Sequence, residues 1–173
     1  MTRDYGLLVE LLRVQFIAPS TSTNLGQRKV APVSAFLEVL EGDWVARNAL
    51  SFAIRDGFAV SPGHTLVITR RVVSDWWSAT TDEQAAILDL VDRVKRDLDE
   101  SHRPDGYNVG FNSGAAAGQT IDHLHLHVIP RYHGDMPDPR GGIRHAITGK
   151  GNYLASTPLP SSDSQGRQLV TPL

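Results

Sequence analysis

Apolar positions in the middle of the chain recur with the period of a helix. Between residues 81 and 101 they return every three or four positions, and so mark one face of a helix: Ile87, Leu88, Val91, Val94 and Leu98. The segment from Thr81 to Gln84 matches a capping box, and Pro104 limits the other end. A helix is therefore predicted over residues 81–101.

Shorter apolar runs, rich in β-branched residues, predict strands. Gly, Pro, Asp and Asn separate these runs and favour turns between them. The predicted strands cover residues 44–47, 49–54, 65–70, 107–112 and 122–130.

The two ends of the chain differ from this central part. Residues 3–16 carry leucines at mixed helical spacing and predict a short amphipathic helix, and residues 18–34 are rich in Ser, Thr, Pro and Gly. We therefore expect an N-terminal helix and linker over residues 1–35 and a compact domain over 36–153. The polar, Pro- and Ser-rich residues 154–173 are expected to form a flexible tail.

Composition narrows the classes of protein that need to be considered. The 173 residues are 40% hydrophobic and 21% charged, with a net charge of -2, which argues against a protein that coats nucleic acid. Cysteine is absent, which excludes disulfides, thiolate metal ligands and thiol catalysis. No apolar run reaches the length of a membrane span, and Asp4 and Glu10 argue against a signal peptide. We expect a cytoplasmic protein without membrane or nucleic-acid partners.

Three alternating histidines stand on one of the predicted strands. His123, His125 and His127 should share one face of the strand, while the residues between them point into the core. A solvated face seldom carries three imidazoles, so the pattern favours either a metal site or the handling of a phosphoryl group. A metal site of the cupin type would need further ligands such as His64 or His133, because Asp122 lies on the wrong face. The sequence leaves both interpretations open.

Small and neutral polar residues next to the histidines favour the phosphoryl interpretation. Residues 114–118 are only Gly and Ala, so their backbone could approach a phosphate closely. Gln119, Thr120 and Asn112 add neutral hydrogen-bond donors. Such a pocket suits attack on phosphorus by a neutral imidazole nitrogen.

Three ordered blocks of sequence resemble the histidine-triad (HIT) superfamily. Residues 118–130, GQTIDHLHLHVIP, match its signature of three histidines alternating with hydrophobic residues. Residues 55–68 resemble the upstream segment of the family, and residues 105–112 resemble the strand before the triad. The segments 130–135 and 138–144 resemble the bacterial branch related to diadenosine polyphosphate hydrolases and fragile-histidine-triad proteins. The resemblance covers roughly residues 36–153.

The resemblance implies an α+β fold in which a five-stranded antiparallel sheet packs against a long helix, with a short helix and, in this chain, an extra N-terminal helix. It also implies a homodimer. The implied activity is hydrolysis or transfer of a nucleotidyl group at the α-phosphate, through a nucleotidyl-histidine intermediate. Dinucleoside polyphosphates and related nucleotide conjugates are the implied substrates.

The resemblance further assigns roles to the four histidines of the matched blocks. His125 would be the nucleophile, and His127 would contact the transferred phosphate or the leaving group. His123 would orient His125, partly through its backbone carbonyl. His64 matches the fourth histidine of the family, near the phosphate.

The remaining site residues are implied in the same way. Asp56 matches the acid that holds the ribose hydroxyls, although an Asp-Gly turn would explain this residue equally well. Ile54 and Phe52 would lie near the base. Asn112, Gln119 and Thr120 match contacts to the phosphate or the leaving group.

The chain departs from the zinc-binding members of the family. Those members carry a cysteine pair near the start of the domain and a histidine where this chain has Val72. Only His123 of the family's zinc ligands remains, so we expect no structural zinc and no required cofactor, with Mg²⁺ accompanying polyphosphate substrates. Phe36, Leu37 and Val72 are expected to fill the vacated space as a small apolar core.

Two further functions stay open at this point. One is a metal-dependent, cupin-like enzyme that uses the same histidine cluster. The other is a nucleotide-binding sensor without turnover, although the complete triad weighs against a lost activity.

Overall fold

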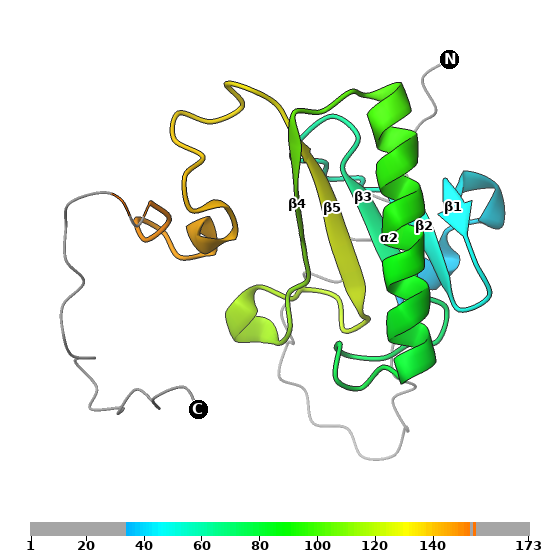
Figure 1. The fold of residues 1–173 in the computed structure, drawn as a ribbon. Helices are drawn as coiled ribbons and strands as arrows, with labels where there is room; N and C mark the ends of the chain where they lie inside the picture. Colours follow the sequence, from blue (N-terminus) through cyan, green and yellow to red (C-terminus); the bar gives the residue numbers. More distant parts are fainter. Residues whose placement is uncertain (1–33, 153, 155–173) are drawn as a thin grey trace, which may run out of the picture. The chain divides into compact units, whose positions relative to one another are not determined.

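A computed structural model describes residues 34–152 and residue 154 (Figure 1). The predicted N-terminal helix, nearly all of the linker and nearly all of the tail lie outside these residues. The contacts divide the chain into two compact units, Met1–Asp135 and Met136–Leu173. The predicted domain boundaries at residues 36 and 153 stay predictions.

Five strands form one antiparallel sheet in the first unit, as predicted. They are β1 (Ala46–Arg47), β2 (Ser51–Arg55), β3 (Thr65–Thr69), β4 (Gly106–Gly110) and β5 (His125–Arg131). Their order across the sheet is β1-β2-β3-β5-β4, so β5 lies between β3 and the edge strand β4. This arrangement places the histidine-bearing strand inside the sheet (Figure 1).

Several predicted strand ends are wrong by one to three residues, for a local reason in each case. Residues 49 and 50 lie in a turn, where Asn48 Oδ1 accepts hydrogen bonds from the backbone N–H groups of Leu50 and Ser51. Pairing therefore begins at Ser51. The strand predicted over residues 122–130 begins at His125, because the chain still turns at His123, whose N–H donates to the Ile121 carbonyl at 2.8 Å.

The long helix α2 (Thr81–Ser101) is confirmed, but its capping box lies one residue earlier than predicted. Thr80 is the N-cap, with its side chain accepting from the Glu83 N–H while the Glu83 carboxylate accepts from the Thr80 N–H. Thr80 has extended backbone angles, so the first helical residue is Thr81. Gln84 instead donates its side-chain amide to the Trp76 carbonyl.

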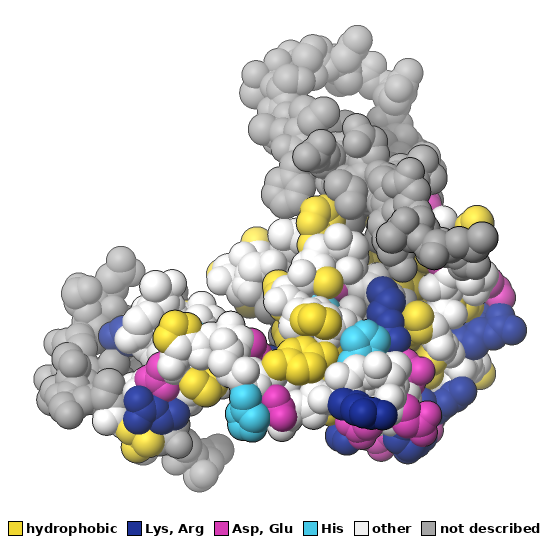
Figure 2. Space-filling model, turned by 90° about the horizontal axis from the view of Figure 1, so that it is seen from above, with side chains coloured by type: hydrophobic (Ala, Val, Ile, Leu, Met, Phe, Trp, Pro, Cys, Tyr) yellow, Lys and Arg dark blue, Asp and Glu magenta, His cyan; other side chains and the backbone are white. Residues whose placement is uncertain are grey.

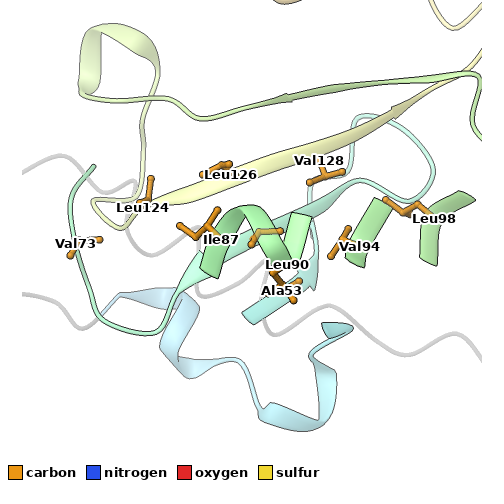
Figure 3. Close-up of a cluster of buried hydrophobic side chains, with 10 residues drawn as sticks. Ala53, Val73, Ile87, Leu90, Val94, Leu98, Leu124, Leu126 and Val128 are labelled. Atoms are coloured by element: carbon orange, nitrogen blue, oxygen red, sulfur yellow. The ribbon is translucent and has the colours of Figure 1, made fainter. Parts of the chain in front are cut away.

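The helix covers one face of the sheet and encloses the larger core. Figure 3 shows side chains from α2 packing against those from β2 and β5, with Val73 at one end. Leu126 and Val128 supply this face of β5, so the alternating residues His125 and His127 turn to the opposite face. The alternation predicted from the sequence is confirmed for these two histidines.

A second apolar cluster lies apart from the first and is made of Phe36, Phe52, Ile54, Leu66 and Ile68. Phe36 belongs to the 3-10 helix η1 (Ala35–Glu38), which is followed by η2 (Glu41–Asp43). The ring of Phe36 lies 5.0 Å from that of His125, so this cluster borders the histidines. The loop between β4 and β5 contains another short 3-10 helix, η3 (Ala115–Ala117).

In the second unit, Gly141 and the backbone of Gly151 lie in close contact. It contains the 3-10 helix η4 (Gly142–Ala146), and Asn152 donates to the Asp138 carboxylate at 2.7 Å. A Cβ atom at Gly141 would meet the Gly151 carbonyl at 1.9 Å, so glycine is required there. Among the helices of residues 34–152, none is long and apolar enough to cross a membrane.

Candidate active site

His125 is held by a hydrogen bond to the backbone of its own strand end. Its ring is buried, and Nδ1 lies 2.7 Å from the His123 carbonyl oxygen. A carbonyl can only accept, so Nδ1 carries the proton and Nε2 carries the lone pair. Burial lowers the pKa of His125, which keeps this tautomer neutral. The arrangement presents one defined nucleophilic nitrogen.

His127 continues into a line of three side chains that ends at Asp56. His127 Nδ1 lies 3.0 Å from His64 Nε2, and His64 Nδ1 lies 3.2 Å from the Asp56 carboxylate. The two contacts at His64 Nδ1 require opposite roles of this atom, because the Asp56 carboxylate can only accept, whereas the Val60 N–H, 3.3 Å away, can only donate. Either tautomer of His64 can form the hydrogen bond between its Nε2 and His127 Nδ1. The line therefore connects His127 to Asp56 through His64.

Burial and neighbouring charges keep this line neutral. Burial, together with the adjacent His125 and His64, lowers the pKa of His127 to about 4. The pKa of His64 is also lowered, chiefly by burial, although Asp56 acts in the opposite direction. At neutral pH the site therefore offers uncharged imidazoles beside one carboxylate.

The same three groups are close enough together to be considered as metal ligands. One ligand atom from each of Asp56, His64 and His127 lies within 4.8 Å of the others. However, Asp56 and His127 engage opposite nitrogens of the His64 ring, so the three donors do not surround a common point. His133, a further candidate ligand, has a side chain that is 94% exposed and lies 3.7 Å from Asp105. The geometry favours a proton relay over a metal centre of the cupin type.

His123 lies before the strand, fully buried, and both of its ring nitrogens have partners. Nε2 donates to the Thr69 carbonyl at 2.8 Å, and Nδ1 lies 2.7 Å from the Ser34 hydroxyl. His123 is therefore not on the strand as predicted, but its ring still packs against Phe36 beside that of His125. Sequence reasoning missed Ser34 and Thr69, because they lie 89 and 54 positions away and no local pattern marks them.

The surroundings of His123 do not fit a structural zinc centre. Such a centre needs four ligands, typically thiolates and imidazoles, whereas the chain has no cysteine and both His123 nitrogens are engaged. The apolar filling predicted for this region is only partly right. Phe36 is buried against His123 and His125, but Leu37 and Val72 are exposed.

The glycine- and alanine-rich loop is held in shape by Gln119. The Gln119 side-chain carbonyl accepts from the Gly114 N–H at 2.7 Å, and its amide donates to the carbonyls of Ser74 and Ile121. Gly114 and Gly118 have φ values of 80° and 84°, which favour glycine. Thus Gln119, predicted as a substrate contact, would have to exchange one of these bonds to reach a phosphate.

The other predicted contacts differ in their exposure. Asn112 and Thr120 are exposed, and no hydrogen bond between described residues engages their side chains. Asn112 lies two residues beyond the end of β4, rather than on the strand as predicted. Phe52 and Ile54 are buried within the apolar cluster that borders His125. Trp44 stacks on Phe52 with ring centres 4.4 Å apart.

Comparisons with known proteins agree with this geometry. A family model described as the HIT domain matches residues 38–134. The chain is 33% identical over 129 residues to an AP-4-A phosphorylase of Mycobacterium tuberculosis, an alignment that covers 71% of this chain and 66% of that protein.

Solved structures show the same fold. A histidine triad nucleotide-binding protein of Sulfolobus tokodaii is 37% identical with a TM-score of 0.53, over 60% of this chain and 69% of that one. A zinc-bound histidine triad family protein of Mycobacterium smegmatis is 33% identical with a TM-score of 0.50, over 55% of this chain and 73% of that one. The matched model covers the sheet, the long helix and all four histidines of the site, and the chain belongs to the histidine-triad (HIT) family.

Proposed function

We propose that the protein is a nucleotide hydrolase or nucleotidyltransferase that acts at the α-phosphate through a nucleotidyl-histidine intermediate on His125. The supporting observation is the 2.7 Å contact from His125 Nδ1 to the His123 carbonyl, which leaves Nε2 as the nucleophile. The similarity to an AP-4-A phosphorylase supports dinucleoside polyphosphates as the substrate class.

The reaction has two balanced steps. First, the lone pair of His125 Nε2 forms a bond to the α-phosphorus, and the bond to the leaving phosphate oxygen breaks with its electron pair on that oxygen. Water or another acceptor then attacks the phosphorus, and the N–P electron pair returns to Nε2. His127 Nε2 takes the acceptor's proton, while Asp56 and His64 stabilise the resulting imidazolium.

The remaining predicted residues would hold the substrate. Asp56 would bind ribose hydroxyls with the lone pairs that His64 and the Phe58 N–H leave free. Phe52 and Ile54 belong to the apolar cluster that borders His125, which suits a neighbouring base. The exposed Asn112 and Thr120, with Gln119 and the backbone of residues 114–118, would contact the phosphates. Mg²⁺ would arrive with long phosphate chains, and no other cofactor is required.

The edge strand β4 supports a homodimer. Among the described residues no strand pairs with its outer side, and Val109 on β4 is an exposed apolar side chain, as is Trp77, whose ring lies 5.9 Å from that of Phe111. On the face shown in Figure 2, basic and acidic side chains are interspersed. A nucleic acid would favour a continuous basic patch, so we propose no nucleic-acid partner. A cytoplasmic location accords with the lack of cysteine.

The protein is expected to fold without zinc, because the hydrogen bonds of His123 and the packing of Phe36 occupy the region where ligands would be needed. Chelator treatment should leave the melting temperature unchanged, and elemental analysis should find zinc well below one per chain. A stoichiometric, tightly held zinc would contradict this and would reopen the metal interpretation of the histidines.

The test of the proposed function is the variant His125→Ala. Turnover of dinucleoside polyphosphates and nucleoside phosphoramidates should fall to background, because no nucleophile remains, while nucleotide binding stays measurable by calorimetry. Rapid quenching in alkali, in which an N–P bond to histidine survives, should find a nucleotide on wild-type protein only. His133→Ala is the matched control, because this exposed histidine should be dispensable. Turnover retained in His125→Ala would refute the mechanism.

A further inference from the structure

The Ser34 hydroxyl is the partner of the His123 nitrogen that the Thr69 carbonyl leaves unprotonated. His123 Nε2 lies 2.8 Å from the Thr69 carbonyl, which only accepts, so Nε2 carries the proton. The neutral ring then has a lone pair at Nδ1, and Ser34 Oγ, 2.7 Å away, donates to it. Ser34 and His123 are both buried, so little water can replace this partner.

The position of His123 in turn affects the proposed nucleophile, His125. Its ring is held at both nitrogens, and its own carbonyl accepts from His125 Nδ1 at 2.7 Å. Phe36, two residues after Ser34, packs its ring against both imidazoles, with centres 5.8 Å from His123 and 5.0 Å from His125. The short segment from Ser34 to Phe36 therefore touches the two histidines with one polar and one apolar group.

We propose that Ser34 is a positioning residue for catalysis: its hydroxyl donates to the His123 tautomer that the Thr69 carbonyl sets and holds the ring in one orientation, so that the His123 carbonyl keeps the proton of His125 on Nδ1 and leaves Nε2 free to attack. Ser34 itself touches neither the substrate nor the reacting atoms. Without the hydroxyl, the His123 ring would lose one of its two anchors, and the carbonyl would hold His125 less firmly. The kinetic consequence rests on the function proposed above, whereas the tautomers can be measured without it.

Ser34→Ala removes the hydroxyl, Ser34→Thr retains one, and Ser34→Cys substitutes a weaker donor. For Ser34→Ala we expect kcat to fall roughly tenfold to a hundredfold with KM nearly unchanged, as for other groups that orient a histidine. Ser34→Thr should restore most of kcat, and Ser34→Cys should be intermediate. Ser51→Ala is the matched control, because this buried hydroxyl bonds to Asn48 and to the Ala86 carbonyl instead of a histidine. It should lower the melting temperature and leave kcat unchanged.

The second measurement is nuclear magnetic resonance of protein labelled with ¹⁵N-histidine. Wild type should show the proton of His125 on Nδ1 and that of His123 on Nε2. In Ser34→Ala the His125 signals should shift toward a mixture of tautomers, whereas Ser51→Ala should leave them unchanged.

The outcomes separate the two proposals. A wild type without turnover would refute the proposed function, and the spectra of Ser34→Ala would still decide the role of Ser34. Wild-type kcat and unchanged His125 signals in Ser34→Ala would overturn the positioning role. If Ser34→Ala does not fold, equal kcat and equal spectra for Ser34→Cys and Ser34→Thr would overturn it as well.

Discussion

The four histidines of the candidate site share one electrostatic condition, which is that burial favours their uncharged forms. Burial is the largest cause of the lowered pKa for each of His64, His123, His125 and His127. A neutral His125 is the form that can attack phosphorus, so the activity should persist below the ordinary histidine pKa of about 6.5 and fall only in more acidic solution. The same lowered pKa values also make the stability of the fold depend on pH.

The stability of the fold should decrease as the pH falls from about 6.5 to 4. In this range unfolded histidines take up protons near their ordinary pKa, whereas folded His127, with a pKa of about 4, does not. The unfolded state then binds more protons, so acid favours unfolding, by up to about 3 kcal/mol from His127 alone. Urea unfolding at pH 7, 5.5 and 4 measures this slope.

The matched variants are His127→Gln, which should flatten the slope, and His133→Gln, which should not, because His133 is exposed. Glu83, whose pKa Arg71 and Thr80 hold at about 2, adds to the slope near pH 4, because its carboxylate takes up a proton first in the unfolded chain, but it adds equally in the wild type and in both variants, so their difference reports on His127. A slope that is equal in wild type and His127→Gln would contradict the assignment.

The helix α2 illustrates what a local pattern can and cannot decide. The apolar spacing located the element correctly, and four of the five residues that mark its face are buried or packed against the core. The pattern is compatible with an N-cap at either Thr80 or Thr81, because Glu83 stands three residues after the first and Gln84 three residues after the second. The choice depends on where the incoming chain becomes extended, which is at Thr80.

These adjacent threonines provide a direct test. Thr80→Ala should destabilise the protein by about 1 kcal/mol, because the Glu83 N–H loses its side-chain acceptor. Thr81→Ala, at the first helical position, should change the free energy of unfolding by only a few tenths of a kcal/mol. Denaturant titration of both variants checks the order, and a larger loss for Thr81→Ala would place the cap where the sequence suggested.

The assembly of the whole protein is expected to follow from its two sheet edges. β1 has only two residues, whereas β4 has five and carries the exposed Val109. A longer unpaired strand with an apolar neighbour is the better candidate for pairing between copies. Sedimentation at micromolar protein should therefore give a dimer.

A pair of matched substitutions locates that interface. Val109→Lys should weaken the dimer by at least tenfold in Kd, because it places a charge at the β4 edge. Val45→Lys, next to β1 and similarly exposed (42% against 44% for Val109), should leave the assembly unchanged. A monomer in the wild type, or equal effects of the two lysines, would exclude this interface.

The sequence by itself determined which elements form and which chemistry they carry. Helical spacing, short β-branched runs and the alternation of His125 and His127 with Leu126 and Val128 each depend on residues a few positions apart. That is why the long helix, the five strands and the histidine-bearing face could be predicted. The absence of cysteine is also plain from the sequence, and with the family resemblance it led to the expectation that no structural zinc is bound.

Only the tertiary structure decided how the site residues are connected. His64 contacts His127, which lies 63 positions later in the chain, and Ser34 contacts His123, which lies 89 positions later. Gln119 donates its side-chain amide to the Ser74 carbonyl, 45 positions earlier, instead of pointing freely at a substrate. Such hydrogen bonds depend on which strands lie side by side and how deeply the polar groups are buried. A buried donor or acceptor must find a partner wherever packing places one, and no local sequence pattern encodes that partner.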